Sequence, residues 1–563
     1  VISIGNSAFS GCTALIGIYM PDSIETVGSS AFYNCTSMEN VKLSNSIIEL
    51  QRSVFVSCNN LCSIRIPEKV QKIGSGTFLN CTSLTEINIP KSMGRETIVG
   101  SYSDGPFEGC KNLKTINFEE GITEIPNCLF QDCEGIEEIK IPDTVTSINS
   151  GAFSGAKNLK TVTIPNSVVT IGGSTFRGCN SLEAIQLPEN VTELSRGLFA
   201  NCTQLRKIRI PEKVQEIGSG TFLNCTSLTE INIPKSMGRE TIVGSYSDGP
   251  FEGCKNLKTI NFEEGITEIP NCLFQDCEGI EEIKIPDTVT SINSGAFSGA
   301  KNLKTVTIPN SVVTIGGSVF RNCISMTDAV ISDSVKGMGT YIFGGCKSLN
   351  KVTLPCNIVE IAEGTFYNCS NLVEVDIPEK VRVIRKNAFY NCDSLDIIIL
   401  PQVFDTIEAY AFYDCDNLRT IKGTENLSTI GTYAFYNCTA LKDISLSSFK
   451  GIEIPAYTFS KCSQLQEVVL PYGLCIIKNN AFSEIPNLIT ISIPRTVSQI
   501  DNTAFSYTKK MTVYGVAGTY AEEWAESVGA TFVNQEVAAT EVSLNKNELT
   551  INKGATEKLL LTI

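Results

Sequence analysis

Residues 61–81 read LCSIRIPEKVQKIGSGTFLNC, and variants of this stretch recur along most of the chain. Its first six letters alternate apolar and polar side chains, which predicts a short β-strand with one buried face. Pro67 ends that strand because proline has no backbone N–H to donate to a β-ladder. Val70 and Ile73 predict a second short extended segment. Gly74 is expected to permit a tight bend after it.

Phenylalanine marks the period of this unit, which follows the pattern LxxIxIPxxVxxIGxxxFxxC. Twenty-two phenylalanines fall on the pattern; 18 of the 21 gaps between them are 23 residues, two are 29 and one is 24. A unit this short cannot bury its own apolar face, so its copies must stack into a solenoid with a continuous core. The marks are Phe9, Phe32, Phe55, Phe78, Phe107, Phe130, Phe153, Phe176, Phe199, Phe222, Phe251, Phe274, Phe297, Phe320, Phe343, Phe366, Phe389, Phe412, Phe435, Phe459, Phe482 and Phe505.

The unit resembles the leucine-rich repeat of the BspA type over about residues 1–510. It departs from the general leucine-rich pattern LxxLxLxxN, because Val70, Val214 and Val381 stand at the asparagine position. The expected fold is therefore a leucine-rich repeat solenoid, a β-rich α/β horseshoe. It has about 22 right-handed coils, a parallel β-ladder on the concave face and a short second ladder opposite. The resemblance also implies an extracellular protein, on a bacterial cell surface or secreted, with a role in adhesion.

Three regions are expected along the chain. The solenoid covers 1–510 and contains a near-identical duplication, in which residues 64–177 match 208–321 at all but two positions. The repeat decays in 511–535, where the spacing of apolar residues predicts a C-terminal cap with a short helix that packs onto the last coil. Residues 536–563 are similar to the start of a group 2 bacterial immunoglobulin-like domain. That domain would be incomplete, so the chain is expected to be a fragment.

Composition excludes several kinds of chemistry. The 563 residues include no histidine, which removes Ser–His–Asp and Cys–His nucleophilic sites and His-ligated metals. The formal net charge of −15 disfavours nucleic acid as a partner. No apolar run reaches the roughly 18 residues of a membrane span. We therefore expect no enzymatic activity, no cofactor, no metal and no membrane insertion in this stretch.

Cysteine is abundant but follows the repeat. Eighteen of the 23 cysteines lie three residues after a repeat phenylalanine, and Ala156 and Ala300 occupy the same slot, which indicates a small buried position. Six of these cysteines follow an asparagine in Asn-Cys-Thr or Asn-Cys-Ser. These match the glycosylation sequon, but we interpret the asparagine as a turn residue. The sequence does not decide whether two disulfides form, one between Cys128 and Cys133 and one between Cys272 and Cys277.

Three sets of residues are candidates for contact with a partner protein. The third and fifth positions of LxxIxI point outward and carry many charges. The alternative to a contact surface is that these charges only keep the protein soluble. The two 29-residue units each carry a six-residue insertion, either a contact loop or a tolerated bulge. Tyrosines gather beside the repeat phenylalanine in the later units, as a recognition strip or as edge packing. The candidates are Arg65, Lys140, Arg209, Lys284, Glu138 and Glu282 on the strand face, Arg95, Tyr102, Arg239 and Tyr246 in the loops, and Tyr390, Tyr413 and Tyr436 in the strip.

The leading hypothesis is a bacterial surface or secreted protein that adheres to unidentified host or other surface proteins. A glycan is a further candidate partner, although the fifth-position column holds only one tyrosine, Tyr19, on which a sugar could stack. The alternatives are a carbohydrate-binding or spacer module of a larger surface enzyme, and a structural stalk without a ligand.

Overall fold

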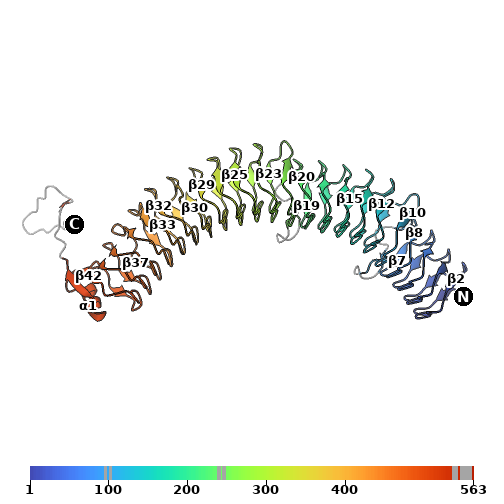
Figure 1. Ribbon diagram of the computed structural model, residues 1–563, viewed down its shortest axis with the longest axis horizontal. Helices are drawn as coiled ribbons and strands as arrows, with labels where there is room; N and C mark the ends of the chain where they lie inside the picture. The colour runs from blue at the N-terminus through green and yellow to red at the C-terminus, as the bar shows by residue number, and fades with distance from the viewer. Residues whose placement is uncertain are drawn as a thin grey trace, which may run out of the picture. The chain divides into compact units, whose positions relative to one another are not determined.

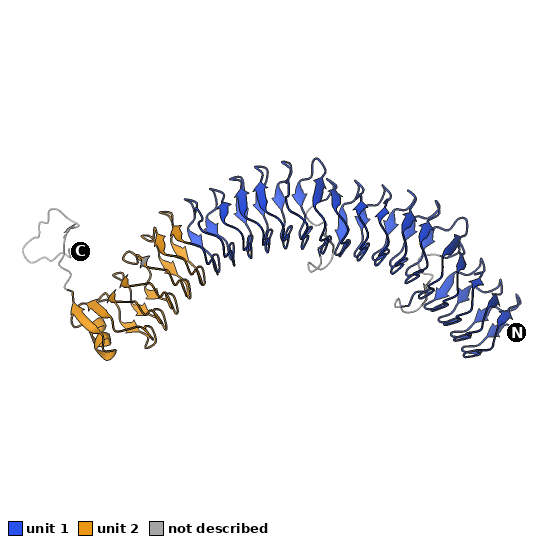
Figure 2. Cartoon of the chain, viewed as in Figure 1, with its two compact units in different colours: residues 1–395 blue, residues 396–563 orange. Residues whose placement is uncertain are grey.

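The computed structural model describes residues 1–93, 104–237 and 249–535, and four short strand segments outside these ranges. It is a β-solenoid of about 22 coils with parallel sheets and one short helix near the C-terminus (Figure 1). The chain divides into two compact units, residues 1–395 (unit 1) and 396–563 (unit 2), which Figure 2 colours separately. Each unit is described by itself below.

In unit 1 the predicted first strands pair in parallel with their counterparts in adjacent coils, apolar residue opposite apolar residue, and they form four separate sheets. Ile64 pairs with Ile87, and Ile87 pairs with Ile116. The strands of this longer ladder are β2 (Gly17–Tyr19), β4 (Asn40–Lys42), β6 (Ser63–Ile64), β8 (Glu86–Ile89), β10 (Thr115–Phe118), β12 (Glu138–Lys140), β14 (Thr161–Thr163), β16 (Ala184–Ile185), β18 (Lys207–Ile208), β20 (Glu230–Ile233), β22 (Thr259–Phe262), β25 (Thr305–Ile308), β27 (Asp328–Ile331) and β29 (Lys351–Thr353).

A shorter ladder runs parallel to the first, as predicted. Its strands are β1 (Ser3–Ile4), β3 (Thr26–Val27), β5 (Glu49–Leu50), β7 (Lys72–Gly74), β9 (Ile98–Val99), β11 (Glu124–Ile125), β13 (Ser147–Ile148), β15 (Thr170–Ile171), β17 (Glu193–Leu194), β19 (Glu216–Gly218), β21 (Ile242–Val243), β23 (Glu268–Ile269), β24 (Ser291–Ile292), β26 (Thr314–Ile315), β28 (Gly337–Met338), β30 (Glu360–Ile361) and β31 (Val383–Ile384). The placement of the longer ladder on the concave face stays a prediction.

Unit 2 repeats the same two ladders and ends in a different kind of element. Its longer ladder holds β32 (Ile397–Ile399), β34 (Thr420–Lys422), β36 (Asp443–Ile444), β38 (Glu467–Val469), β40 (Thr490–Ser492) and β42 (Thr512–Gly515), and its shorter ladder holds β33 (Thr406–Ile407), β35 (Thr429–Ile430), β37 (Glu453–Ile454), β39 (Ile476–Ile477) and β41 (Gln499–Ile500). After these come α1 (Tyr520–Ser527), β43 (Thr531–Asn534), β44 (Ser543–Leu544) and β45 (Leu561–Thr562).

The helix α1 covers the last coil of unit 2. Ala521, Trp524 and Ala525 are its buried residues, and the Trp524 ring lies 4.8 Å from the ring of Phe505, centroid to centroid. The expected short helix and the packing of its tryptophan onto the last coil are therefore confirmed. The expected immunoglobulin-like start falls mostly outside the described residues, where only the antiparallel pair β44–β45 is placed, and it stays a prediction.

The core consists of the apolar positions that the pattern predicts. In the coil quoted first, Leu61, Ile64, Ile66, Val70 and Ile73 all expose 5% or less of their surface. The repeat phenylalanines stack face to face from coil to coil. The rings of Phe222 and Phe251, for example, lie 4.8 Å apart at an interplanar angle of 3°. The six-residue insertion between these two residues leaves the stack in register.

The expectation that Gly74 permits a tight bend is wrong, and glycine is needed there for another reason. Its φ is not in the left-handed region, so the backbone conformation alone does not demand glycine. A Cβ atom there would lie 2.3 Å from the backbone nitrogen of Arg52 in the preceding coil. Glycine is required because two coils approach each other closely at this point.

Left-handed turns do occur, on both sides of the repeat phenylalanine. Around Phe222, Gly220 has φ of 60° and Asn224 has φ of 58°. All six asparagines of the Asn-Cys-Thr and Asn-Cys-Ser motifs have φ between 58° and 62°, which confirms their interpretation as turn residues. Asparagine suits this conformation better than most residues.

All 23 cysteines lie in the described part of the chain and all are free thiols, so neither candidate disulfide is formed. Seventeen of them are buried. Their role is more than that of a small apolar residue, because the Sγ of Cys225 donates a hydrogen bond to the carbonyl of Phe199 in the preceding coil, at 3.2 Å. The same bond recurs in most coils, for example from Cys81 to Phe55 at 3.1 Å.

Candidate contact surfaces

The six charged candidates belong to unit 1 and are all exposed. Arg65 and Arg209 directly follow β6 and β18. Glu282 forms an isolated bridge with Thr305, and Lys284 lies outside a strand.

Glu138 and Lys140 belong to β12, with the buried Ile139 between them, so both side chains point away from the core. Ion pairs between neighbouring coils flank this strand, such as Lys160 with Glu137 at 2.7 Å. The strand face is therefore a charged surface on a rigid framework, as the alternation predicts.

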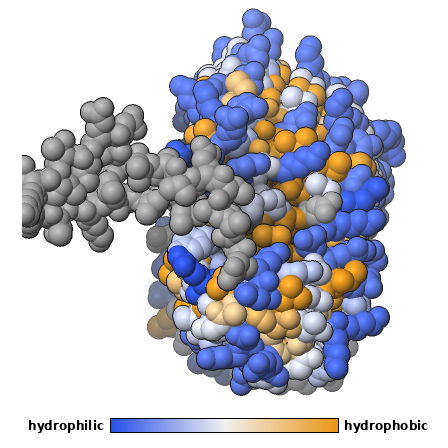
Figure 3. Space-filling model, turned by 90° about the vertical axis from the view of Figure 1, so that its left-hand side faces the viewer, coloured by the Kyte–Doolittle hydropathy of each residue, from blue (hydrophilic) through white to orange (hydrophobic). Residues whose placement is uncertain are grey.

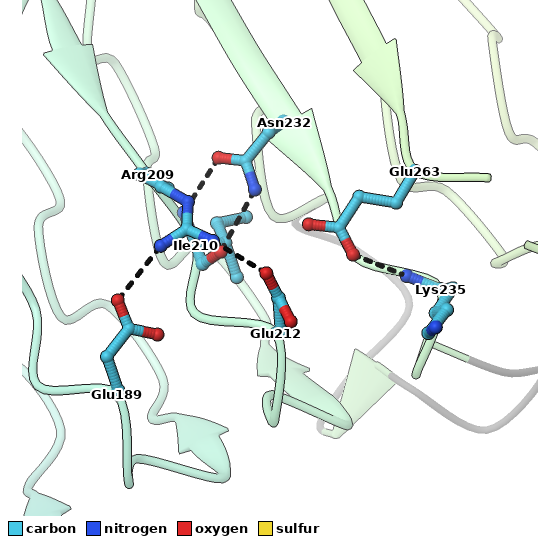
Figure 4. A network of polar contacts seen from close by, with 7 residues as sticks. All are labelled: Glu189, Arg209, Ile210, Glu212, Asn232, Lys235 and Glu263. Atoms are coloured by element: carbon cyan, nitrogen blue, oxygen red, sulfur yellow. Dashed lines mark hydrogen bonds and ion pairs between the residues drawn. The ribbon is translucent and has the colours of Figure 1, made fainter.

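Arg209 is held by two carboxylates of its own chain (Figure 4). Its Nη1 lies 2.9 Å from Oε1 of Glu189, and its Nη2 lies 2.9 Å from Oε1 of Glu212. The duplicate residue Arg65 pairs with Glu68 at 3.4 Å, and it has no second carboxylate partner among the described residues, because Asn45 stands where the second copy has Glu189. The side chain of Arg65 is also the more exposed, at 75% against 55% for Arg209. The two copies thus offer a partner different arginines.

A side-chain amide fixes the backbone directly beside each of these arginines. Asn232 accepts a hydrogen bond from the nitrogen of Ile210 at 2.9 Å and donates one to the oxygen of the same residue at 2.9 Å (Figure 4). Asn88 does the same for Ile66. These bonds replace ladder bonds where the strands β6 and β18 end, so the arginine that precedes each isoleucine projects from an ordered backbone.

A shallow groove lies next to Arg209 on the same face. Ala184, Glu189 and Arg209 are among the residues that line it. The other lining residues are Thr161, Val162, Ile185, Gln186, Leu187, Lys207, Ile208 and Pro211. Apolar side chains bordered by charges are typical of protein contact surfaces.

A second surface lies in unit 2. We define the tyrosine cluster as Tyr410, Tyr413, Tyr433, Tyr436 and Tyr457, all of them half-buried. The ring centroids of the first column lie 5.0 Å apart for Tyr410 and Tyr433, and 4.5 Å apart for Tyr433 and Tyr457. Tyr413 and Tyr436 stack at 4.8 Å in a second column beside it. Neighbouring coils thus present an ordered patch of aromatic rings.

The first column of this cluster carries backbone strain. Tyr410, Tyr433 and Tyr457 have φ of 60°, 59° and 59°. A bulky residue in this conformation costs about 1–2 kcal/mol, and most other coils place glycine, serine or asparagine there. A stacked aromatic pair returns about 0.5–1.5 kcal/mol, which roughly offsets the strain. The area that these half-buried rings remove from water adds to this return, so the fold tolerates the strain.

Charged groups surround the cluster. The ammonium of Lys461 lies 5.1 Å from the ring centroid of Tyr436. Its hydrogen bond with the Tyr436 hydroxyl raises the pKa of Lys461, and the carboxylates of Glu484 and Asp414 add to this effect. Asn437 donates a hydrogen bond to Asp414 at 2.9 Å. On the face of the molecule in Figure 3, apolar residues lie in patches bordered by hydrophilic ones.

The tyrosine candidates are stacked within each unit. In unit 2, Tyr413 and Tyr436 belong to the cluster, and in unit 1, Tyr390 stacks on Tyr367 at 4.9 Å. The loop candidates Arg95, Tyr102, Arg239 and Tyr246 lie outside the described residues.

Two contact residues, Glu189 and Tyr457, are not among those predicted from the sequence. Glu189 follows a strand-ending proline, as Glu212 does, so aligning the coils would have placed it beside Arg209. Tyr457 stands two residues before Phe459, in the same place as Tyr433 before Phe435, but the single 24-residue gap displaces it by one position.

The described residues hold no group of three or more His, Cys, Asp or Glu side chains with the geometry to bind a metal ion. Among the helices of that part of the chain, none has the length and apolar character needed to cross a bilayer.

The repeat matches the family model described as BspA type leucine rich repeat region. The model matches in six copies, over residues 1–103, 96–168, 146–281, 240–350, 268–396 and 382–512. Because these matches cover most of the sequence, the chain belongs to the BspA-type leucine-rich repeat family. A fold of this class suggests protein–protein interaction.

Several solved bacterial structures are similar. A leucine-rich repeat protein from Bacteroides ovatus is 26% identical over 63% of this chain and 88% of its own, with a TM-score of 0.53. One from Eubacterium ventriosum is 24% identical over 63% and 89%, with a TM-score of 0.41. A leucine rich cell surface protein from Faecalibacterium prausnitzii is 25% identical over 64% and 86%, with a TM-score of 0.36. No curated protein matches the chain.

Proposed function

We propose that the chain is a non-catalytic adhesion protein, exposed on a bacterial cell surface or secreted, that binds a host or other surface protein through the strand face of unit 1. The surface location rests on membership of the family. The binding mode rests on the charged side chains that rigid strands hold outward, which suit an extended protein contact.

The observation that carries the proposal is the difference between Arg65 and Arg209. Both stand at the same place in their coils, but Arg209 pairs with two carboxylates at 2.9 Å and Arg65 with one at 3.4 Å. The guanidinium group has five hydrogen-bond donors and forms bidentate pairs with carboxylates. Arg65 therefore retains donors for a carboxylate of a partner, and arginine is frequent among residues that dominate binding energy.

The first experiment is binding of the purified chain to immobilised host matrix proteins and to a glycan panel, with an unrelated acidic protein as control. Saturable binding to a matrix protein supports the proposal. Binding confined to glycans would favour the carbohydrate module instead, and binding to neither would favour the stalk.

Single substitutions then test the face itself. We expect Arg65→Ala to weaken binding to the captured matrix protein by about tenfold, the loss of about 1.4 kcal/mol of contact energy. Arg209→Ala is the matched control and is expected to change binding less than threefold, because its donors are already used within the chain. Binding is measured by surface plasmon resonance, and melting temperatures show that both variants fold.

A gain-of-function variant sharpens this test. Glu189→Asn gives the second copy the residue that the first copy has at Asn45. Arg209 then loses one carboxylate, and binding is expected to strengthen. Equal effects of Arg65→Ala and Arg209→Ala, with no effect of Glu189→Asn, would show that the strand face is not the contact surface.

A further inference from the structure

Stacking between neighbouring coils covers ring faces in the tyrosine cluster of unit 2. Both faces of Tyr433 are covered, by Tyr410 at 5.0 Å and by Tyr457 at 4.5 Å, with interplanar angles of 5° in both pairs. Tyr436 is covered by Tyr413 on one side and approached by Lys461. A sugar ring needs an open aromatic face to stack on, so these rings are poorly placed for carbohydrate.

Positive groups do find tyrosines elsewhere in this unit. The guanidinium of Arg495 lies 5.6 Å from the ring centroid of Tyr472, and its Nη2 donates a hydrogen bond to the Tyr472 hydroxyl at 3.2 Å. Lys461 and Tyr436 form a similar pair. The chain's own contacts therefore show which chemistry its tyrosines accept across neighbouring coils: a cation with hydrogen-bond donors.

The charged residues beside the cluster also favour a positively charged partner. Asp414 and Asp416 follow Tyr413 in the sequence, and the carboxylates of Asp414 and Glu484 lie within electrostatic reach of Lys461. This surrounding is acidic and would attract positive charge. The cluster spans three successive coils and is two columns wide, a narrow strip that suits an extended chain better than a globular surface.

From these contacts, we propose that the tyrosine cluster binds an extended, arginine-rich segment of a partner protein. The guanidinium groups lie along the ring edges, donate to the tyrosine hydroxyls and pair with the flanking carboxylates. The strained tyrosines are then retained for this contact, since backbone strain gathers at binding sites. This site does not depend on the strand face of unit 1, and separate variants test the two.

The test is fluorescence anisotropy with a labelled twelve-residue peptide of alternating arginine and glycine, added to the full chain. A peptide of alternating glutamate and glycine is the negative control. The main variant carries Tyr410→Asn, Tyr433→Asn and Tyr457→Asn, because asparagine adopts the left-handed conformation at low cost. These changes leave the net charge at −15, so general attraction between the acidic chain and the peptide is unchanged.

Tyr507→Asn is the matched control. Tyr507 also has a left-handed backbone, with φ of 62°, and is 87% exposed, but it lies outside the cluster. We expect the triple variant to bind the arginine peptide about tenfold more weakly, while a cooperative melting transition shows that it is folded. Tyr507→Asn is expected to leave the affinity unchanged.

Equal affinity of the triple variant and the original chain would overturn the proposal and leave only charge attraction. A lower melting temperature with unchanged affinity would assign the tyrosines to packing. Should the triple variant fail to fold, Tyr433→Phe and Tyr436→Phe keep the rings and remove the hydroxyls. Unchanged affinity in both would then overturn the proposal, and a loss of at least threefold in either would support it.

Discussion

In most coils a buried thiol is hydrogen-bonded to the coil before it. The Sγ of Cys202 donates to the carbonyl of Phe176 at 3.0 Å, and burial raises the pKa of Cys202 to about 12. Thiolate is the reactive form of cysteine, so a buried thiol with a raised pKa is doubly protected. The buried thiols of this chain therefore contribute to packing rather than to redox chemistry.

Alkylation of the native chain should follow this burial. We expect iodoacetamide at pH 8 to modify Cys12, Cys62 and Cys356, the three exposed cysteines, and to modify Cys128, Cys272 and Cys475 more slowly. The 17 buried cysteines should react only after denaturation. Mass spectrometry counts the modified residues before and after unfolding in urea. Rapid native modification of Cys202 would contradict the packing role, and a shortfall after unfolding would reveal disulfides.

At this scale the repeat pattern predicts which side chains are buried but not which atoms they meet in the next coil. It predicts that Cys202 is buried but not that its thiol donates a hydrogen bond. For Gly74 it predicts a bend, whereas the structure shows a close approach to the backbone of Arg52. The pattern places Arg65 and Arg209 at the same outward position without the difference in their carboxylates. Each of these contacts depends on residues about one coil away in the sequence, and a periodic pattern averages such differences out.

The phenylalanine stack is the element whose period the sequence predicts best, because one residue type at a fixed spacing leaves little choice of register. Phe222 is fully buried between Phe199 and Phe251, at centroid distances of 5.5 and 4.8 Å. Phe222→Ala is expected to cost about 3–5 kcal/mol of local stability. Hydrogen exchange should then quicken in the neighbouring coils and stay unchanged near Phe32.

Phe9→Ala is the control for this variant. Phe9 is 37% exposed and stacks on one side only, against Phe32, so its loss leaves a smaller cavity. If Phe222→Ala speeds exchange equally along all of unit 1, the coils unfold as one block. That result would contradict the local coupling expected of a repeat protein.

For the molecule as a whole, the near-identical duplication gives a test of how far the coils are interchangeable. Removing residues 64–207 joins Ser63 to Ile208, which holds the same place in the pattern as Ile64, and keeps 23 residues between Phe55 and Phe222. Because coils contact mainly their neighbours, we expect the shortened chain to fold, with unchanged circular dichroism per residue. Removing 64–200 instead shifts the strand pattern by seven residues and should turn apolar side chains outward.

The variant that lacks 64–207 also tests binding. In it, Arg209 follows the coil of Asn45 rather than the coil of Glu189, so this variant should bind as the original chain does. Arg209→Ala in this variant should weaken binding as Arg65→Ala does in the original chain. Unfolding of both deletion variants alike would mean that a coil depends on more than its place in the repeat.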